Sequence, residues 1–121
     1  MNFPKLFASF LYAWKGIILL IRSEQNAWVH LLATLLVIVF GCYFNISNGE
    51  WIAAILCIVL VLSAEGFNTA LEKLTDLISP DTHPLAGQVK DLAAGAVLIT
   101  AIGAFIVGLI IFLPYFLKFF Q

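Results

Sequence analysis

Long uninterrupted stretches of apolar residues dominate the chain. Residues 31–49, 51–64 and 92–117 contain no charged side chain. A helix that crosses a bilayer needs about 20 mostly apolar residues. The pattern therefore predicts three membrane-spanning helices, which we expect at about residues 27–46, 51–78 and 88–113.

The middle stretch meets a charge at Glu65, yet its helical spacing of hydrophobic residues continues to Ile78. We expect one long helix from Trp51 to Ile78, which at 1.5 Å per residue is about 40 Å long. The hydrocarbon core of a bilayer is only about 30 Å thick. The last turns of this helix, with their carboxylates, therefore lie at the membrane surface, where charge is tolerated.

Two polar segments separate the expected spans. Residues 45–50 form a short turn, which makes the first two spans an antiparallel hairpin. Residues 79–84 contain two prolines, which interrupt helices on either side. Asp81 or Thr82 is expected to cap the helix that follows.

Residues 3–22 have a different pattern, with polar side chains near one helical stripe and large hydrophobic ones elsewhere. This pattern is typical of an amphipathic helix that lies in the headgroup region. A signal peptide is the alternative, but the apolar stretch is short and no small-residue cleavage site follows it. We therefore predict a single all-α membrane domain, residues 1–121, with an N-terminal interfacial amphipathic helix and three transmembrane helices.

The composition agrees with this prediction. Hydrophobic residues make up 63% of the 121 positions, charged residues 11%, and the mean hydropathy is +1.07. A soluble domain has about 45–50% apolar and about 25% charged residues, and a chain this short cannot bury such an excess. The net charge of −1 gives no electrostatic basis for binding nucleic acid. Cys42 and Cys57 are expected to be small apolar side chains rather than a disulfide.

The basic residues set the expected orientation. With three spans, one of the six falls on one side of the membrane and the other five on the opposite side. Loops rich in lysine and arginine stay in the cytosol. We therefore expect a multi-pass protein of the cell inner (cytoplasmic) membrane, with its N-terminus and most of its carboxylates cytosolic. The five residues on the cytosolic side are Lys5, Lys15, Arg22, Lys73 and Lys90, and Lys118 lies outside.

Three carboxylates share one face of the middle helix. At 100° per residue, Glu72 and Asp76 each lie about 20° from Glu65, and Asn68 lies about 60° away. Carboxylates this close repel one another unless a cation joins them. Mg²⁺ takes oxygen ligands and bridges to phosphates, so the pattern indicates phosphoryl transfer.

A solvated helix end, whose acids merely pair with Lys73 and Lys90, is the alternative. It accounts easily for Asp76. It accounts poorly for Glu65, because an ionisable group that follows 14 uncharged residues is costly and usually functional.

Several motifs resemble the prokaryotic diacylglycerol kinase family, which includes the undecaprenol kinases. They are Trp14-Lys15-Gly16, Ser23-Glu24-x-Asn26, Glu65-x-x-Asn68-Thr69-Ala70-x-Glu72, Asp76, His83-Pro84-Leu85-Ala86 and Lys90-Asp91-x-Ala93-Ala94-Gly95. The resemblance covers about residues 3–113 and keeps the order of all elements. It implies an interfacial helix and three spans, assembled as a homotrimer with active sites between protomers. Small residues at every fourth position from Ala96 to Gly108 also favour close helix packing.

The resemblance also implies the roles of individual residues. Glu65 matches the general base, supported by Asn68, and Glu24 and Glu72 match the ligands of Mg²⁺. ATP contacts are implied for Lys5, Tyr12, Glu24, Glu72, Asp76, Asp81, Thr82, His83, Lys90 and Asp91. Lipid contacts are implied for Trp14, Asn26, Glu65 and Ala94.

The function expected from this resemblance is transfer of the γ-phosphate of ATP to the primary hydroxyl of a membrane lipid alcohol, undecaprenol or diacylglycerol. No Walker-type or other glycine-rich nucleotide motif is present in the sequence. A small proton-coupled transporter that uses Glu65 is the alternative, although one intramembrane acid suffices for such a protein and this chain has a cluster. A non-enzymatic membrane protein is a third class, and it would tolerate changes at Glu65 and Glu72.

Overall fold

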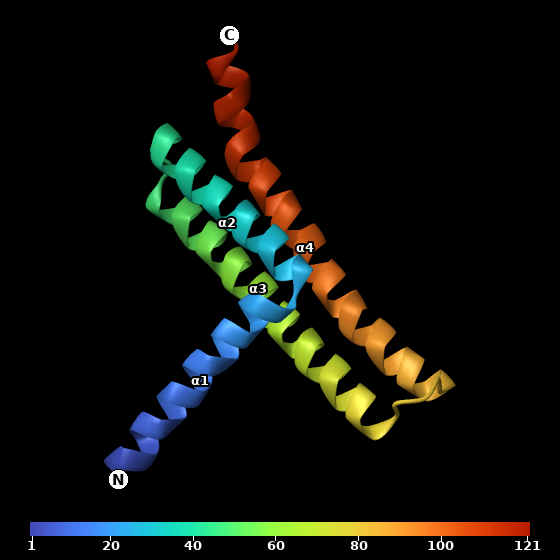
Figure 1. Ribbon diagram of the computed structural model, residues 1–121. Helices are drawn as coiled ribbons and strands as arrows, with labels where there is room; N and C mark the ends of the chain where they lie inside the picture. The colour runs from blue at the N-terminus through green and yellow to red at the C-terminus, as the bar shows by residue number, and fades with distance from the viewer.

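The protein, described over all 121 residues by a computed structural model, consists of four helices and no strand (Figure 1). All four helices are long and apolar enough to cross a membrane. The predicted all-α membrane class is therefore confirmed. The placement of the first helix in the headgroup region stays a prediction, because its length and composition would also suit a span. The helices are α1 (Phe3–Ser23), α2 (Gln25–Phe44), α3 (Asn48–Ile78) and α4 (Pro84–Phe119).

Three of the helices form an elongated bundle (Figure 1). α2 and α3 run antiparallel as a hairpin, and α4 returns along α3, with which it makes the most extensive contact. α1 leaves the bundle at an angle, and it contacts α2 and α3 but not α4. The two ends of the chain consequently lie far apart.

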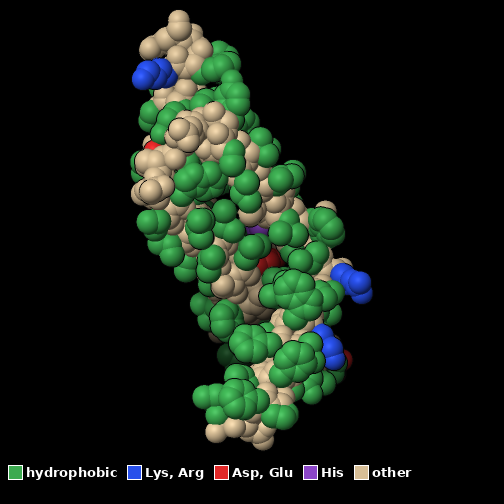
Figure 2. All heavy atoms as spheres, turned by 90° about the vertical axis from the view of Figure 1, so that its left-hand side faces the viewer, with side chains coloured by type: hydrophobic (Ala, Val, Ile, Leu, Met, Phe, Trp, Pro, Cys, Tyr) green, Lys and Arg blue, Asp and Glu red, His purple; other side chains and the backbone are tan.

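Very little of the chain is buried in its own interior. Only ten of the 121 residues are buried, and most large hydrophobic side chains are exposed. Figure 2 shows hydrophobic side chains over most of one face, with lysine and arginine confined to a few places. In water such a surface would be costly. Lipid removes that cost, because acyl chains are as apolar as the side chains.

The hairpin between α2 and α3 is shorter than the sequence suggested. Asn45 ends α2 in the left-handed conformation, with φ 51°, which asparagine tolerates better than most residues. Ser47 then caps α3, and its capping box with Glu50 makes residues 48–50 the first helical turn. The hydroxyl of Tyr115 donates to Glu50 Oε1 at 2.7 Å and ties α4 to this end of α3.

Both ends of α4 differ from expectation. His83 caps the helix, not Asp81 or Thr82: its Nδ1 accepts a hydrogen bond from the backbone N–H of Leu85 at 3.1 Å. The cap falls here because Pro84, whose fixed φ suits a first helical position, begins the helix.

At its other end α4 continues through Pro114 to Phe119, six residues beyond the expected end at 113. Proline removes one helical hydrogen bond. Ring contacts from Phe116 to Phe40 and Phe44, and from Tyr115 to Phe44, hold these last turns against α2.

Gly41 of α2 packs closely against the side chain of Trp51 on α3. A Cβ at Gly41 would lie 2.5 Å from Cη2 of Trp51, whose ring is packed against the core cluster of Ile46, Ala54 and Ile111. We expect Gly41→Ala to destabilise the fold by about 1–3 kcal/mol, the usual cost of overpacking. Thermal unfolding of the purified protein in detergent measures this change. Gly103→Ala is the control, because nothing lies within 4 Å of its added Cβ, and equal stability of both variants would contradict the prediction.

Candidate active site

Three polar side chains interrupt an otherwise apolar set of buried residues. Glu65, Asn68 and Thr69 are 1%, 6% and 5% exposed, and all three lie on α3. Part of the polar face predicted from the sequence, Glu65 and Asn68, therefore points inward, whereas Asp76 of the same face is exposed. Burying a carboxylate is expensive unless it gains partners, so this part of α3 is a candidate for function.

The buried polar atoms lack the partners that would offset this cost. Both carboxylate oxygens of Glu65, Oδ1 of Asn68 and Oγ1 of Thr69 have no hydrogen bond within the chain. Unsatisfied buried groups are rare in native proteins and often mark places where a ligand binds. The only basic side chain within ion-pair distance is on α2, where Nε2 of His30 lies 3.8 Å from Oε2 of Glu65.

Exposure of the carboxylates rises along α3 toward its C-terminal end. Glu65 is buried, Glu72 is half-buried and Asp76 is exposed. Nδ2 of Asn68 donates to Oε1 of Glu72 at 3.1 Å, which orients that carboxylate. The face therefore offers one deep acid and a second, hydrogen-bonded acid about two turns nearer the end of the helix.

Glu24 lies at the junction of α1 and α2, at the same end of the bundle as Glu72 (Figure 1). It is half-buried between α1 and α2 and its side chain makes no capping bond. His30 faces Glu65 across the antiparallel pair of α2 and α3. Glu24 precedes His30 by six residues and Glu72 follows Glu65 by seven, so both glutamates lie on the same side of that pair.

The structure gathers no group of three histidine, cysteine or acidic side chains that could hold a metal alone. Magnesium, however, is usually bound by one or two carboxylates together with the phosphates of a nucleotide. Glu72, with one oxygen oriented by Asn68, and Glu24 at the same end of the bundle are carboxylates suited to that kind of site. They do not fit a metal site built from protein ligands only.

Lys90 is held by an acid of the neighbouring helix. Its Nζ donates to Oδ1 of Asp76, and this ion pair joins α4 to α3. The alternative in which the acids merely pair with lysines therefore applies to Asp76. Lys73 is exposed and forms no ion pair with any acid. Glu65 is not paired with a lysine either.

Two groups among the other residues expected to contact ATP lie apart from each other. Lys5 and Tyr12 are exposed on the outer half of α1. Asp81, Thr82 and His83 are exposed in the loop between α3 and α4, and Asp91 is exposed about two turns into α4. Because α1 makes no contact with α4, one chain does not bring the two groups together (Figure 1).

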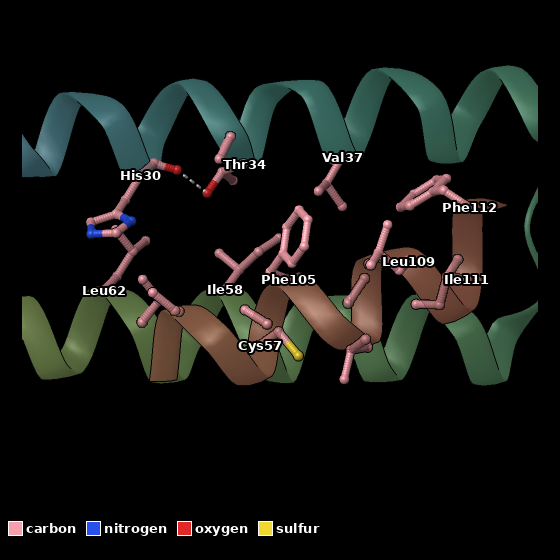
Figure 3. Close-up of a pocket in the computed structure, with 17 residues that line it drawn as sticks. His30, Thr34, Val37, Cys57, Ile58, Leu62, Phe105, Leu109, Ile111 and Phe112 are labelled. Atoms are coloured by element: carbon pink, nitrogen blue, oxygen red, sulfur yellow. Dashed lines mark hydrogen bonds between the residues drawn. The ribbon is translucent and has the colours of Figure 1, made fainter. Parts of the chain in front are cut away.

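The residues expected to contact lipid are also exposed, apart from Glu65. Trp14, Asn26 and Ala94 lie on three different helices, and none of them lines a main cavity. One cavity, of about 660 Å³, lies between α1, α2 and α3 and reaches Thr69 and Lys73. A second, of about 360 Å³, lies between α2, α3 and α4 and has His30 in its lining (Figure 3).

Reasoning from the sequence missed two members of this site. His30 received no role, although it is one of only two histidines and stands at the border of a charge-free run. Thr69 entered only as part of a motif, and it proves to be buried with an unpaired hydroxyl. The position of His30 within an apolar stretch was the available signal.

Comparison with known proteins gives consistent matches over nearly the whole chain. The model of a family described as prokaryotic diacylglycerol kinase matches residues 11–112. An undecaprenol kinase of Bacillus subtilis is 42% identical over 110 residues, covering 91% of this chain and 89% of that protein. A diacylglycerol kinase of Synechocystis is 38% identical over 92% of this chain and 64% of its own length. A diacylglycerol kinase of Escherichia coli is 30% identical over 95% of this chain and 94% of its own.

Proposed function

The chain belongs to the prokaryotic diacylglycerol kinase family and is a membrane-embedded lipid kinase, and we propose that it transfers the γ-phosphate of ATP to the primary hydroxyl of undecaprenol or diacylglycerol. The relatives named as kinases of these two lipids suggest the two candidate acceptors. One observation of the structure carries the choice of site. The carboxylate of Glu65 is buried on a membrane helix and makes no hydrogen bond within the chain.

The proposed chemistry divides the polar face of α3 between two tasks. Glu65, the deepest acid, accepts the proton of the lipid hydroxyl as the oxygen attacks the γ-phosphate. A lipid hydroxyl anchored by its tails reaches this depth, whereas ATP stays nearer the aqueous side. Asn68 supports the site by orienting Glu72 through its amide.

Glu24 and Glu72 hold the nucleotide through its metal ion in this proposal. Bound Mg²⁺ would offset the negative charge of the phosphates, which is its usual contribution to phosphoryl transfer. Lys90 adds a positive charge at the same end of the bundle, and its pairing with Asp76 keeps it there. Asp81, Thr82, His83 and Asp91 form the exposed border that faces the nucleotide, as the resemblance implies.

A homotrimer is part of the proposal, because a single chain leaves the site incomplete. Lys5 and Tyr12 on α1 are separated from the residues at the start of α4, and the two helices share no contact. Assembly of several chains would allow α1 of one protomer to approach α4 of another. Ala96, a small residue exposed on α4, would allow a neighbouring helix to pack closely there.

The direct test is a kinase assay on the purified chain with ATP labelled at the γ-phosphate. Undecaprenol and diacylglycerol are supplied separately in mixed micelles with Mg²⁺. We expect label to enter at least one lipid in proportion to protein. Absence of labelled lipid with both acceptors, from folded protein, would contradict the proposal, and the ratio of the two rates identifies the better acceptor.

The orientation in the membrane yields a separate prediction. We expect a cytosolic N-terminus and site in the inner (cytoplasmic) membrane and an external C-terminus, because five of six basic residues lie on one side of three spans. A reporter fused after Gln121 that is active only outside the cytosol should be active. The same reporter placed before Met1 is the control and should be silent. The reverse result would show that the site faces away from cytosolic ATP.

A further inference from the structure

We propose that His30 is a positioning residue for the carboxylate of Glu65, a proposal that rests on the proposed function. His30 lies on α2 and Glu65 on α3, and Nε2 of the imidazole is 3.8 Å from Oε2 of the carboxylate. Figure 3 shows the imidazole projecting from α2 toward Leu62 on α3. The pair therefore joins two helices at the depth of the expected base.

Glu65 needs such a partner. It is 1% exposed and neither of its oxygens has a hydrogen bond. A general base works only if its oxygen is aimed at the proton that it accepts. A buried carboxylate with no fixed contact can rotate about its side-chain bonds, and it loses that aim.

Two other nitrogen donors of the region are engaged elsewhere. Asn68, one turn along the same helix, directs its amide to Glu72. Lys90 of α4 is held by Asp76. No lysine or arginine of any helix lies within ion-pair distance of Glu65, so His30 is the only group there that can carry a positive charge.

The contact has room to tighten. A separation of 3.8 Å is longer than a hydrogen bond, which needs about 2.7–3.2 Å. A small rotation of either side chain closes the difference, and catalytic hydrogen bonds often shorten only in the complex with substrate. The imidazole then donates one N–H and fixes the orientation of the carboxylate.

The surroundings of His30 favour this role. Its side chain is 20% exposed and borders the cavity between α2, α3 and α4, whose walls are mostly hydrophobic. Figure 2 shows a histidine and an acidic side chain together in a hollow of the apolar surface. A hydrogen bond in apolar surroundings is electrostatically stronger than one in water. The hydroxyl of Thr34 donates to the carbonyl of His30 at 2.8 Å and does not compete for the ring.

The test compares an apolar replacement with one that keeps a nitrogen donor. His30→Leu removes the hydrogen-bond donor. If this variant does not fold, His30→Met is used as the apolar variant instead. His30→Gln retains an N–H at a similar distance from the backbone. In the kinase assay with the full chain we expect the apolar variant to lose at least about tenfold in kcat, less than loss of the base itself, while KM for ATP changes little. His30→Gln should recover most of the rate.

Two controls separate positioning from packing. Cys57→Ala alters the same cavity away from Glu65 and should leave kcat unchanged. In a Glu65→Gln background, the apolar change at His30 should have little further effect, because two residues that act as a unit are not additive.

The outcomes separate this inference from the proposed function. An inactive wild-type chain would overturn both proposals. If the wild type is active, three results would overturn the role of His30 alone. They are a normal rate for the apolar variant, equal rates for the leucine and glutamine variants, and additive losses in the double variant.

Discussion

Glu65→Gln should lower kcat by about two orders of magnitude or more, the usual scale for loss of a positioned base. Glutamine keeps the size and reach of glutamate but does not accept the proton of the hydroxyl. Because Glu65 is buried and lies seven residues, or roughly 10 Å, from Glu72, binding of magnesium and nucleotide should change little. Single-turnover kinetics and ATP binding on the same preparation measure the two effects separately.

Glu50→Gln is the matched control for this substitution. It makes the same chemical change on the same helix, at the end far from the site, where Glu50 accepts from Tyr115. We expect it to keep full activity and to lose some stability. Weak ATP binding by Glu65→Gln would make Glu65 a ligand of the metal, and normal turnover would assign it a structural role.

The architecture was largely predictable from the sequence because the solvent dictates it. A chain in lipid satisfies its backbone within helices, so charge-free runs of sufficient length identify spans without knowledge of tertiary contacts. That Glu65, Asn68 and Glu72 share one face of α3 followed from helical periodicity alone. Glu65 was recognisable because an ionisable side chain after a long apolar run is energetically costly and usually has a function.

The features that sequence did not predict depend on how helices meet. The contact of His30 with Glu65 follows from the register of α2 against α3, which the close approach at Gly41 and Trp51 helps to set. The cap at His83 depends on a side chain that is uncommon in that role. The continuation of α4 through Pro114 depends on ring contacts with α2 that compensate for one lost hydrogen bond.

The metal ligands separate from the base by a different experiment. Glu72→Gln and Glu24→Gln should each lower turnover by at least about a hundredfold, because a metal ion that stabilises phosphate charge contributes several kcal/mol and about 1.4 kcal/mol corresponds to a factor of ten. Each change removes one anionic oxygen but keeps the shape of the side chain. In the Glu72→Gln variant the amide of Asn68 still finds a carbonyl acceptor on the new side chain, so the fold should persist.

The dependence on magnesium identifies the role of these glutamates. A weakened ligand shell requires more metal, so rising Mg²⁺ should restore part of the activity of Glu72→Gln and Glu24→Gln but none of that of Glu65→Gln. Titration of ATP binding at several Mg²⁺ concentrations, with Glu50→Gln as control, measures the shift. Near-normal activity of either variant at ordinary magnesium would remove that glutamate from the metal site. If nucleotide binding is intact but no magnesium concentration restores activity, the residue instead acts beside Glu65 in the proton transfer. Added magnesium relieves only a defect in metal binding.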